Sequence, residues 1–210
     1  MVYPVLAAVT VALTKGLSLD QILPAIGDLT PTRGRLEPIP LANGAYLLRD
    51  DYKSPLETIH AALDTLSEIP ARRRMVVLGD VSEPPGSTGP IYRNIGMHVA
   101  KTTSRAIFIS LSRKGLKNYA AGAKRGGLPS SSIIKVHHDI FKVIDLLQTN
   151  LTHGDVVLIK GRAHQQLDRI SLALSGKKVR CNAVICQSRS IRCQDVPMLE
   201  RGWNGIRFVI

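Results

Sequence analysis

Hydrophobic and polar positions change their spacing several times along the middle of the chain. Apolar runs of strand length occur at residues 36–39, 45–48, 74–80, 105–111, 133–136 and 155–160. Segments with apolar side chains at the spacing of one helix face lie between them, at residues 56–69, 91–102, 139–150 and 165–174. Strands that alternate with amphipathic helices predict a doubly wound α/β domain whose sheet is mostly parallel, with right-handed crossovers.

The two ends of the chain do not continue this alternation. Residues 3–13 are apolar and rich in alanine, and Ser18 begins a second helical segment at residues 19–26, which stops before Pro31. No strand pattern accompanies them, so we expect a helix pair that is the remnant of a larger domain. Residues 176–210 mix cysteines, arginines and isolated apolar side chains, and we expect an appended tail that packs on the domain or on a partner.

The composition is that of a folded, soluble protein. The 210 residues, 44% hydrophobic and 21% charged, can bury a core without covalent cross-links. The apolar stretch from Tyr3 to Leu13 is too short to cross a bilayer and lacks the basic start of a secretory signal. We therefore expect no membrane span and a cytoplasmic chain.

Three cysteines, Cys181, Cys186 and Cys193, lie near the end of the chain. Their odd number argues against a disulfide scaffold, and no Cys-x-x-Cys pair is present. A zinc site would need a fourth ligand from elsewhere in the chain. Reduced thiols are therefore favoured over zinc, and we expect no metal ligands.

The charge balance is strongly basic, with 28 Lys and Arg against 16 Asp and Glu. Clusters of cations lie at residues 72–74, 113–114, 124–125 and 177–180. A basic surface attracts nucleotides, nucleic acids and anionic precursors alike. Because aromatic residues make up only 4% of the chain, we interpret the clusters as solvated faces, while a nucleic-acid surface stays open as the alternative.

Polar residues gather where two of the expected strands end. Arg49, Asp50 and Asp51 follow one strand, and Gly79 and Asp80 close another. Open α/β sheets hold their ligands at the carboxyl ends of the strands. We therefore expect the two groups to lie at the same edge of the sheet and to form a site there.

Three short segments, in this order and spacing, resemble the start of the C-terminal domain of the Mur ligases. They are Gly-Arg-Leu-Glu at residues 34–37, Leu-Leu-Arg-Asp-Asp-Tyr-Lys-Ser-Pro at 47–55 and Val-Val-Leu-Gly-Asp-Val-Ser-Glu at 76–83. Residues 3–9 and 154–161 are similar to further segments of that family, so the resemblance covers about residues 2 to 175. Within the family it is closest to the members that add D-alanyl-D-alanine.

The resemblance implies a division of the chain and a function. Residues 1–32 would be the helical end of a central ATP-binding domain, and residues 33–175 a Rossmann-like C-terminal domain, followed by the tail at 176–210. Mur ligases are ATP-dependent amide ligases of peptidoglycan precursor synthesis. The C-terminal domain is expected to bind part of the nucleotide and the incoming amino acid or dipeptide.

The family pattern also implies nucleotide-binding residues. Arg35 would meet phosphate oxygens in a bidentate way, and Asp51 would accept the ribose hydroxyls. Asp50 and Lys53 are further nucleotide-binding candidates, although the family often has Asn or His where Lys53 stands. The alternatives are a plain linker arginine for Arg35 and a turn cap before the Pro55 helix for the two aspartates.

Substrate-binding candidates follow the later strands. Lys160, Arg162, Asp80 and Glu83 fit family positions that would contact the substrate. Lys160 could equally be a lysine at the surface end of a strand. No residue of this chain is assigned a catalytic role.

The expected cofactors of the full-length enzyme are ATP and Mg²⁺. The glycine-rich loop that holds phosphates in such ligases, Gly-x4-Gly-Lys-Ser/Thr, does not occur in these 210 residues. The nearest segment, residues 122–127, has neither its spacing nor its Ser or Thr, and we interpret it as a flexible surface loop. We therefore expect half of a nucleotide site here. The rest, and most contacts with the peptidoglycan precursor, would lie on an N-terminal portion outside this chain, so the chain alone should be inactive.

The alternative function is a non-catalytic basic domain that binds nucleic acid or joins a protein assembly. Salt-dependent retention on nucleic acid would favour it. A dinucleotide-binding dehydrogenase is a poor third, because no Gly-x-Gly-x-x-Gly follows the first strand.

Overall fold

The computed structural model describes residues 2–184 and 193–202. The chain divides into two compact units, Met1–Thr32 and Arg33–Ile210. In the described residues, no helix is both long and apolar enough to cross a membrane.

The first unit consists of two helices, α1 (Val2–Thr14) and α2 (Leu19–Gly27), as the sequence predicted. Ser18 precedes α2, and its backbone N–H donates to the Gln21 side chain at 2.9 Å, which satisfies one of the amide groups at the helix start. Several apolar side chains of the two helices are more than half exposed, among them Leu6, Val11 and Leu23.

The second unit is built on one sheet of six strands. They are β1 (Glu37–Pro40), β2 (Tyr46–Asp50), β3 (Arg73–Leu78), β4 (Arg105–Ser110), β5 (Ile133–His137) and β6 (Asp155–Lys160). Their order is β1-β2-β6-β3-β4-β5, with β1 antiparallel to β2 and every other pair parallel. The mostly parallel α/β fold predicted from the sequence is confirmed.

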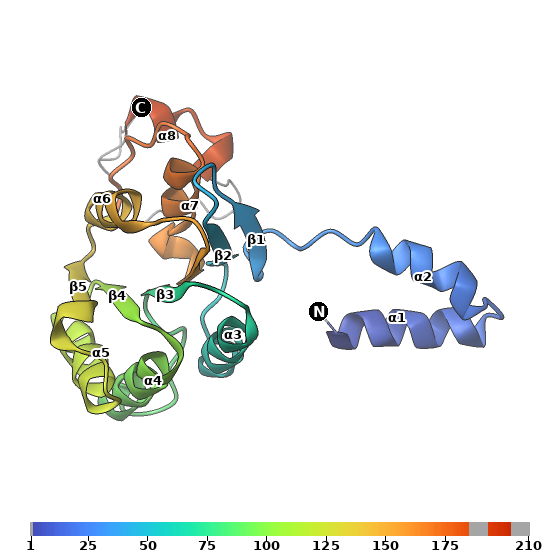
Figure 1. Ribbon diagram of the computed structural model, residues 1–210, viewed down its shortest axis with the longest axis horizontal. Coiled ribbons are helices and arrows are strands. Elements are labelled where there is room, and N and C mark those ends of the chain that lie inside the picture. The colour runs from blue at the N-terminus through green and yellow to red at the C-terminus, as the bar shows by residue number, and fades with distance from the viewer. Residues whose placement is uncertain (1, 185–192, 203–210) are drawn as a thin grey trace, which may run out of the picture. The chain divides into compact units, whose positions relative to one another are not determined.

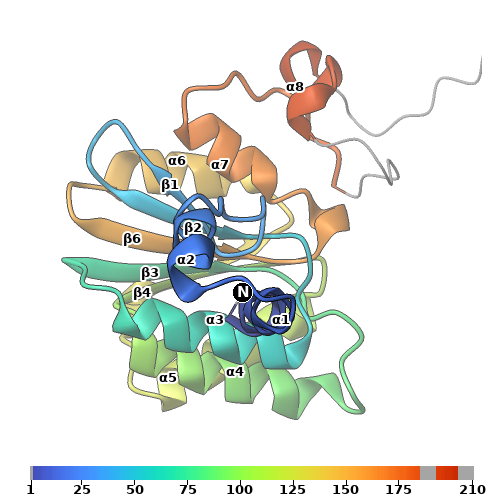
Figure 2. The same ribbon diagram turned by 90° about the vertical axis from the view of Figure 1, so that its right-hand side faces the viewer.

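Helices cover both faces of this sheet (Figures 1 and 2). One face carries α3 (Leu56–Glu68), α4 (Thr88–Thr102) and α5 (Arg113–Arg125), and the other carries α6 (Ile140–Asn150) and α7 (Asp168–Leu174). Each face has its own apolar core: Ile59, Ile95 and Phe108 belong to the first, and Val77 and Val143 to the second. The polar carboxyl ends of β2, β3, β4 and β6 lie between these helical layers, at one edge of the sheet.

The helix α5 was not expected, and the interpretation of residues 122–127 as a flexible surface loop is wrong. Gly122 is buried inside α5, and the helix ends at Arg125, just before Gly126. A Cβ on Gly122 would overlap the carbonyl oxygen of Arg93 in α4, and a Cβ on Gly96 would overlap that of Tyr119 in α5. The two helices therefore cross through glycines, in closer contact than any larger residue permits.

Short elements complete the unit. They are the 3-10 turns η1 (Ser130–Ser132), η2 (Ala163–Gln165) and η3 (Cys193–Asp195) and the helix α8 (Met198–Arg201). In the described part of the tail, Cys193 and Leu199 pack against Leu172 of α7. Arg169 of α7 donates to the carbonyls of Cys181 and Ala183, at 2.7 Å each. The expected thiol at Cys186 lies outside the described residues.

Candidate functional site

Arg49, near the end of β2, lies among three carboxylates. Its Nε donates to both oxygens of Asp51, at 3.0 and 3.2 Å, and its terminal nitrogens lie 3.7 Å from Glu37 and Asp168. Burial opposes the charge of Arg49, but the surrounding carboxylates raise its pKa above the usual value. The guanidinium of Arg49 thus links the polar end of β2 to Glu37, Asp51 and Asp168.

Asp50 forms a second ion pair with Lys160 of β6. The ammonium donates to Asp50 Oδ2 at 2.6 Å and to the carbonyl of Lys53 at 3.1 Å, and the Lys160 side chain is fully buried. Lys160 is the register partner of both Asp50 and Leu78, because β6 lies between β2 and β3. The ion pair joins β2 to β6, and this register places the ends of β2 and β3 at the same edge of the sheet, as the sequence predicted.

Arg35 follows Gly34 in the segment before β1. Its guanidinium lies over the ring of Tyr52, 4.9 Å from the ring centroid, and both side chains are exposed. Gly34 has a φ of +67°, and a Cβ there would lie 2.8 Å from Asp51 Oδ1. Only glycine therefore allows the segment that carries Arg35 to come so close to the Asp51 carboxylate.

Asp80, which follows β3, belongs to a hydrogen-bonded network with three neighbouring elements. One carboxylate oxygen accepts from the hydroxyls of Ser110 and, at 3.4 Å, Tyr92, and the other accepts from the Gln165 amide at 3.3 Å. The Gln165 oxygen in turn accepts the Asp80 N–H at 2.9 Å and the Arg162 N–H at 3.1 Å. This network joins the segments that follow β3 and β6 to the end of β4 and to α4.

Besides Arg49, Asp51 and Lys160 at this edge have shifted pKa values. Burial raises the pKa of Asp51 to about 6, against the opposing effect of Arg49. Burial also lowers the pKa of Lys160, and the adjacent Asp50 carboxylate partly offsets that effect. The edge thus holds a carboxyl group that changes charge just below neutral pH.

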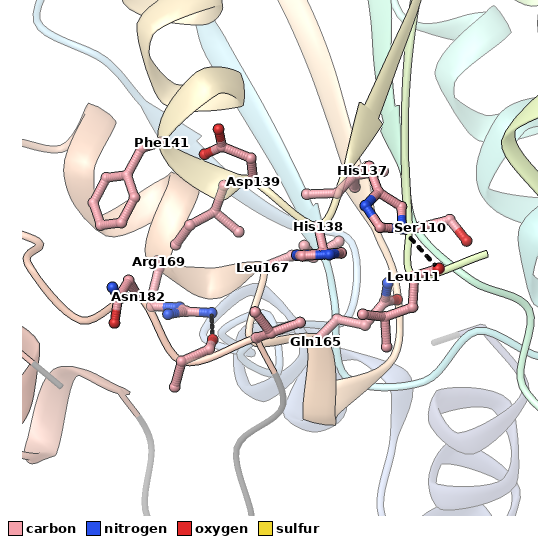
Figure 3. A pocket seen from close by; sticks show the side chains of 14 residues that line it. Ser110, Leu111, His137, His138, Asp139, Phe141, Gln165, Leu167, Arg169 and Asn182 are labelled. Atoms are coloured by element: carbon pink, nitrogen blue, oxygen red, sulfur yellow. Dashed lines mark hydrogen bonds between the residues drawn. The ribbon is translucent and has the colours of Figure 1, made fainter. Parts of the chain in front are cut away.

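A pocket of about 440 Å³ opens beside the Asp80 network (Figure 3). Ser110 and Gln165 line it on the side of Asp80, and His137, His138 and Arg169 line it elsewhere. Figure 3 shows the His138 ring between Arg169 and Leu111. The buried Arg169 guanidinium and the two imidazoles give part of this pocket a polar, basic lining, while Leu111 and Phe141 among others give it an apolar one.

The remaining predicted residues lie around these groups. Arg162 is half-buried, Lys53 is exposed and contributes its carbonyl to Lys160, and Glu83 is exposed at a φ of +45°. The structure brings Asp50, Asp51 and Lys160 together but gives Glu83 no hydrogen bond or ion pair to a residue it describes. The assigned nucleotide and substrate roles remain predictions.

Sequence reasoning missed the residues that hold the site in place. Ser110, Gln165, Asp168 and Arg169 were not among the predicted site residues, and Arg49 was expected at the polar end of its strand but without a role of its own. All five are buried. A charged residue inside an otherwise apolar strand was the signal for Arg49. Gln165 lies in the 3-10 turn η2 and Asp168 in the short helix α7, and only the packing of β6 between β2 and β3 brings them to the edge.

Within residues 2–184 and 193–202, no three His, Cys, Asp or Glu side chains lie close enough together to bind a metal ion.

Comparison with known proteins identifies several relatives. The chain is 30% identical to the UDP-N-acetylmuramoyl-tripeptide–D-alanyl-D-alanine ligase of Synechocystis over 156 residues, 74% of this chain and 33% of the relative. It is 28% identical to the UDP-N-acetylmuramoyl-L-alanyl-D-glutamate–2,6-diaminopimelate ligase of Geobacillus kaustophilus over 170 residues, 78% of this chain and 33% of the relative. The chain thus spans about a third of each of these two proteins.

Solved structures show the same fold. One of MurF from Acinetobacter baumannii superposes with a TM-score of 0.68 at 21% identity, covering 82% of this chain and 37% of that one. MurF ligase from Thermotoga maritima, solved in complex with ADP, gives a TM-score of 0.64 at 20% identity, covering 80% of this chain and 36% of that one. Residues 34–163, more than half of the chain, match the family model described as Mur ligase, glutamate ligase domain. That match includes the segment of Arg35, the ends of β2 and β3, and Lys160. Because it extends over more than half of the chain, the chain belongs to the Mur ligase family.

Proposed function

We propose that this chain is the C-terminal part of an ATP-dependent amide ligase that extends a peptidoglycan precursor. The observation that carries the proposal is the position of Arg35 and Asp51 at the carboxyl edge of a domain of this family. In this role the domain binds one side of the nucleotide and presents the incoming amine.

The geometry supports a phosphate contact through Arg35. Its guanidinium is exposed, oriented by the Tyr52 ring, and forms no ion pair with any residue that the structure describes. A planar guanidinium of this kind matches two phosphate oxygens at once. Because the ring already restrains the side chain, part of the entropic cost of ordering an arginine is offset before a ligand binds.

Asp51 supports a contact with the ribose. A carboxylate can accept about four hydrogen bonds. In the described residues, the side-chain donor to the Asp51 carboxylate is Arg49 Nε, which lies near both oxygens, so the carboxylate can accept further hydrogen bonds. Asp50 is less available, because Lys160 already binds its Oδ2. We therefore assign the ribose contact to Asp51 and a positioning role to Asp50 and Lys160, which hold the end of β2 against β6.

ATP fits these residues, and we propose that Mg²⁺ accompanies it, as phosphoryl transfer ordinarily requires. When bound, ATP would supply the phosphoryl group that activates a precursor carboxylate for attack by an amine. The contribution of this chain is to bind and orient, through Arg35 on the phosphates and Asp51 on the ribose.

We further propose that the incoming amino acid or dipeptide binds in the pocket between the ends of β4 and β5. Its volume of about 440 Å³ is in the range of small-molecule sites. Gln165 lies both in this pocket and in the Asp80 network, so the pocket adjoins the end of β3 at the same edge of the sheet. The buried Arg169 offers a positive charge for the carboxylate of such a substrate.

Residues 1–32 are proposed to be the end of a central domain. Their exposed apolar side chains, including Leu6 and Leu23, are those of helices that cover a larger core.

A domain exchange tests the proposed function. Residues 33–175 would replace the matching region of the Synechocystis D-alanyl-D-alanine ligase, and phosphate release would be measured with UDP-N-acetylmuramoyl-tripeptide and either D-alanyl-D-alanine or diaminopimelate. We expect amine-dependent turnover with one of these amines. We also expect Arg35→Ala in the exchanged domain to lower turnover by about 10- to 100-fold, the loss of one charge-assisted contact.

The host ligase without the exchanged region, and this chain alone, serve as controls and should show no turnover. A chimaera that folds and binds its UDP precursor normally, but turns over neither amine, would contradict the proposal.

A further inference from the structure

The positive charge of this chain is concentrated in one segment. Residues 84–138 contain no aspartate or glutamate but nine lysines and arginines, whereas the rest of the chain has nineteen against sixteen acidic residues. The segment therefore carries nine of the twelve net positive charges. It forms α4, β4, α5, η1 and β5, which include the edge strand of the sheet that lies farthest from β1.

Five of the nine cations belong to α5. They are Arg113, Lys114, Lys117, Lys124 and Arg125, and all five are exposed. The opposite side of the helix, with Leu116, Tyr119 and Ala123, is buried in the core. From Arg113 to Arg125 the row of cations extends for about 18 Å, since a helix rises about 1.5 Å per residue.

These charges do not serve the stability of the domain. Arg93 and Arg105 in the same segment donate to Asn118 and Asn150, but no α5 cation forms an ion pair within the part of the chain that the structure describes. Arg113 and Lys114 also lie in the first turn of α5, which has no acidic residue. A cation there faces the positive end of the helix dipole, which is unfavourable.

We propose that the exposed face of α5 binds the phosphate backbone of double-helical nucleic acid. Such a row of unpaired cations matches the regularly spaced phosphates of a double helix. The proposed contact is with the backbone and not with the base sequence, since cations on phosphates fix a protein on the duplex without reading its bases.

Two other polyanions fit less well. Single-stranded nucleic acid is bound with the help of exposed aromatic rings, and the three aromatics of this segment, Tyr92, Phe108 and Tyr119, are 6%, 0% and 0% exposed. An anionic membrane favours helices that insert an apolar face into the lipid, and the apolar face of α5 is packed in the protein core.

Fluorescence anisotropy tests the proposal with the whole chain and a labelled DNA duplex of about 20 base pairs, at salt concentrations from about 50 to 200 mM. The variant replaces Lys114, Lys117 and Lys124 by Gln, which keeps helix propensity. The matched control replaces Lys142, Lys177 and Lys178 by Gln, three exposed lysines that lie outside the segment. Thermal unfolding followed by circular dichroism verifies that both variants are folded.

The α5 variant should bind the duplex about tenfold more weakly at the lowest salt, with a salt slope smaller by about 2 to 3, since each lost phosphate contact removes about 0.9. The control should bind like the parent. Equal losses in both variants would mean that net charge alone acts, and no binding by the parent would overturn the proposal. Tighter binding to a single strand of the same length, or to phosphatidylserine vesicles, would overturn the assignment to double-helical nucleic acid.

Discussion

Arg49 balances the charges at the end of β2, because it is the cation that three buried or half-buried carboxylates share. Asp51 is 6% exposed, and the pKa of its carboxyl group is about 6 in the folded chain. The ordinary value for an unfolded chain is about 3.9. The difference arises chiefly from burial, which disfavours the charged form more than Arg49 favours it.

This raised pKa predicts a specific pH dependence of stability. Between about pH 4 and pH 6 the unfolded chain loses the Asp51 proton before the folded chain does, so the free energy of unfolding falls as pH rises through this window. The expected change is on the order of 2 to 3 kcal/mol, with 1.36 kcal/mol for each pKa unit. Urea unfolding at pH 4 and pH 7, for the parent and Asp51→Asn, measures it.

The comparison of the two proteins isolates Asp51 from the other titrating groups. The pKa of His60 is lowered, first by burial and second by His98. The titration of His60 therefore changes the stability of the parent and of Asp51→Asn by the same amount. Asp51→Asn should lose less stability than the parent between these pH values. An identical loss in both proteins would show that the Asp51 pKa is not raised.

At the scale of single elements, the glycine contact between α4 and α5 determines how closely these helices pack. We expect Gly122→Ala to lower the free energy of unfolding by about 2 kcal/mol. The added methyl group would overlap the backbone of Arg93, which is fixed within α4. Gly89→Ala in α4 is the matched control, since its Cβ would lie 3.4 Å from the flexible end of Arg93. That control should stay within about 1 kcal/mol of the parent. Urea unfolding measures both, and a Gly122→Ala protein as stable as the control would contradict the packing.

The same glycines explain which elements could be predicted from the sequence. All six strands, and the helices with continuous apolar stripes such as α3 and α6, lie within a few residues of their predicted positions. The helix α5 was missed because its buried face has few large apolar side chains, Leu116 and Tyr119, among small residues. Its cations at both ends had been interpreted as separate surface clusters. Helix propensity, which disfavours glycine, did not indicate that Gly96 and Gly122 are needed where α4 and α5 cross closely.

At the scale of the whole molecule, the edge where polar residues gather was predictable, and their partners were not. Parallel strands end at a common edge, so Asp50, Asp51 and Asp80 could be placed together from the pattern alone. The pairing of Asp50 with Lys160 depends on β6, more than a hundred residues later, entering the sheet between β2 and β3. Chain order alone suggests that β2 and β3 are neighbours, so the burial of Lys160 could not be foreseen.

The most direct measurement of the central claim is an NMR titration of the isotope-labelled chain with ATP, which reports both where ATP binds and how tightly. Two charge-assisted contacts, less the cost of ordering, leave about 4 kcal/mol, which corresponds to a dissociation constant near 1 mM. We expect the largest shift changes at Arg35, Asp51 and Tyr52, and weaker binding after Arg35→Ala or Asp51→Asn. Inorganic triphosphate, which has no ribose, should be sensitive to Arg35→Ala alone. Shifts confined to α5, or an affinity that neither substitution changes, would contradict a nucleotide site at the end of β2.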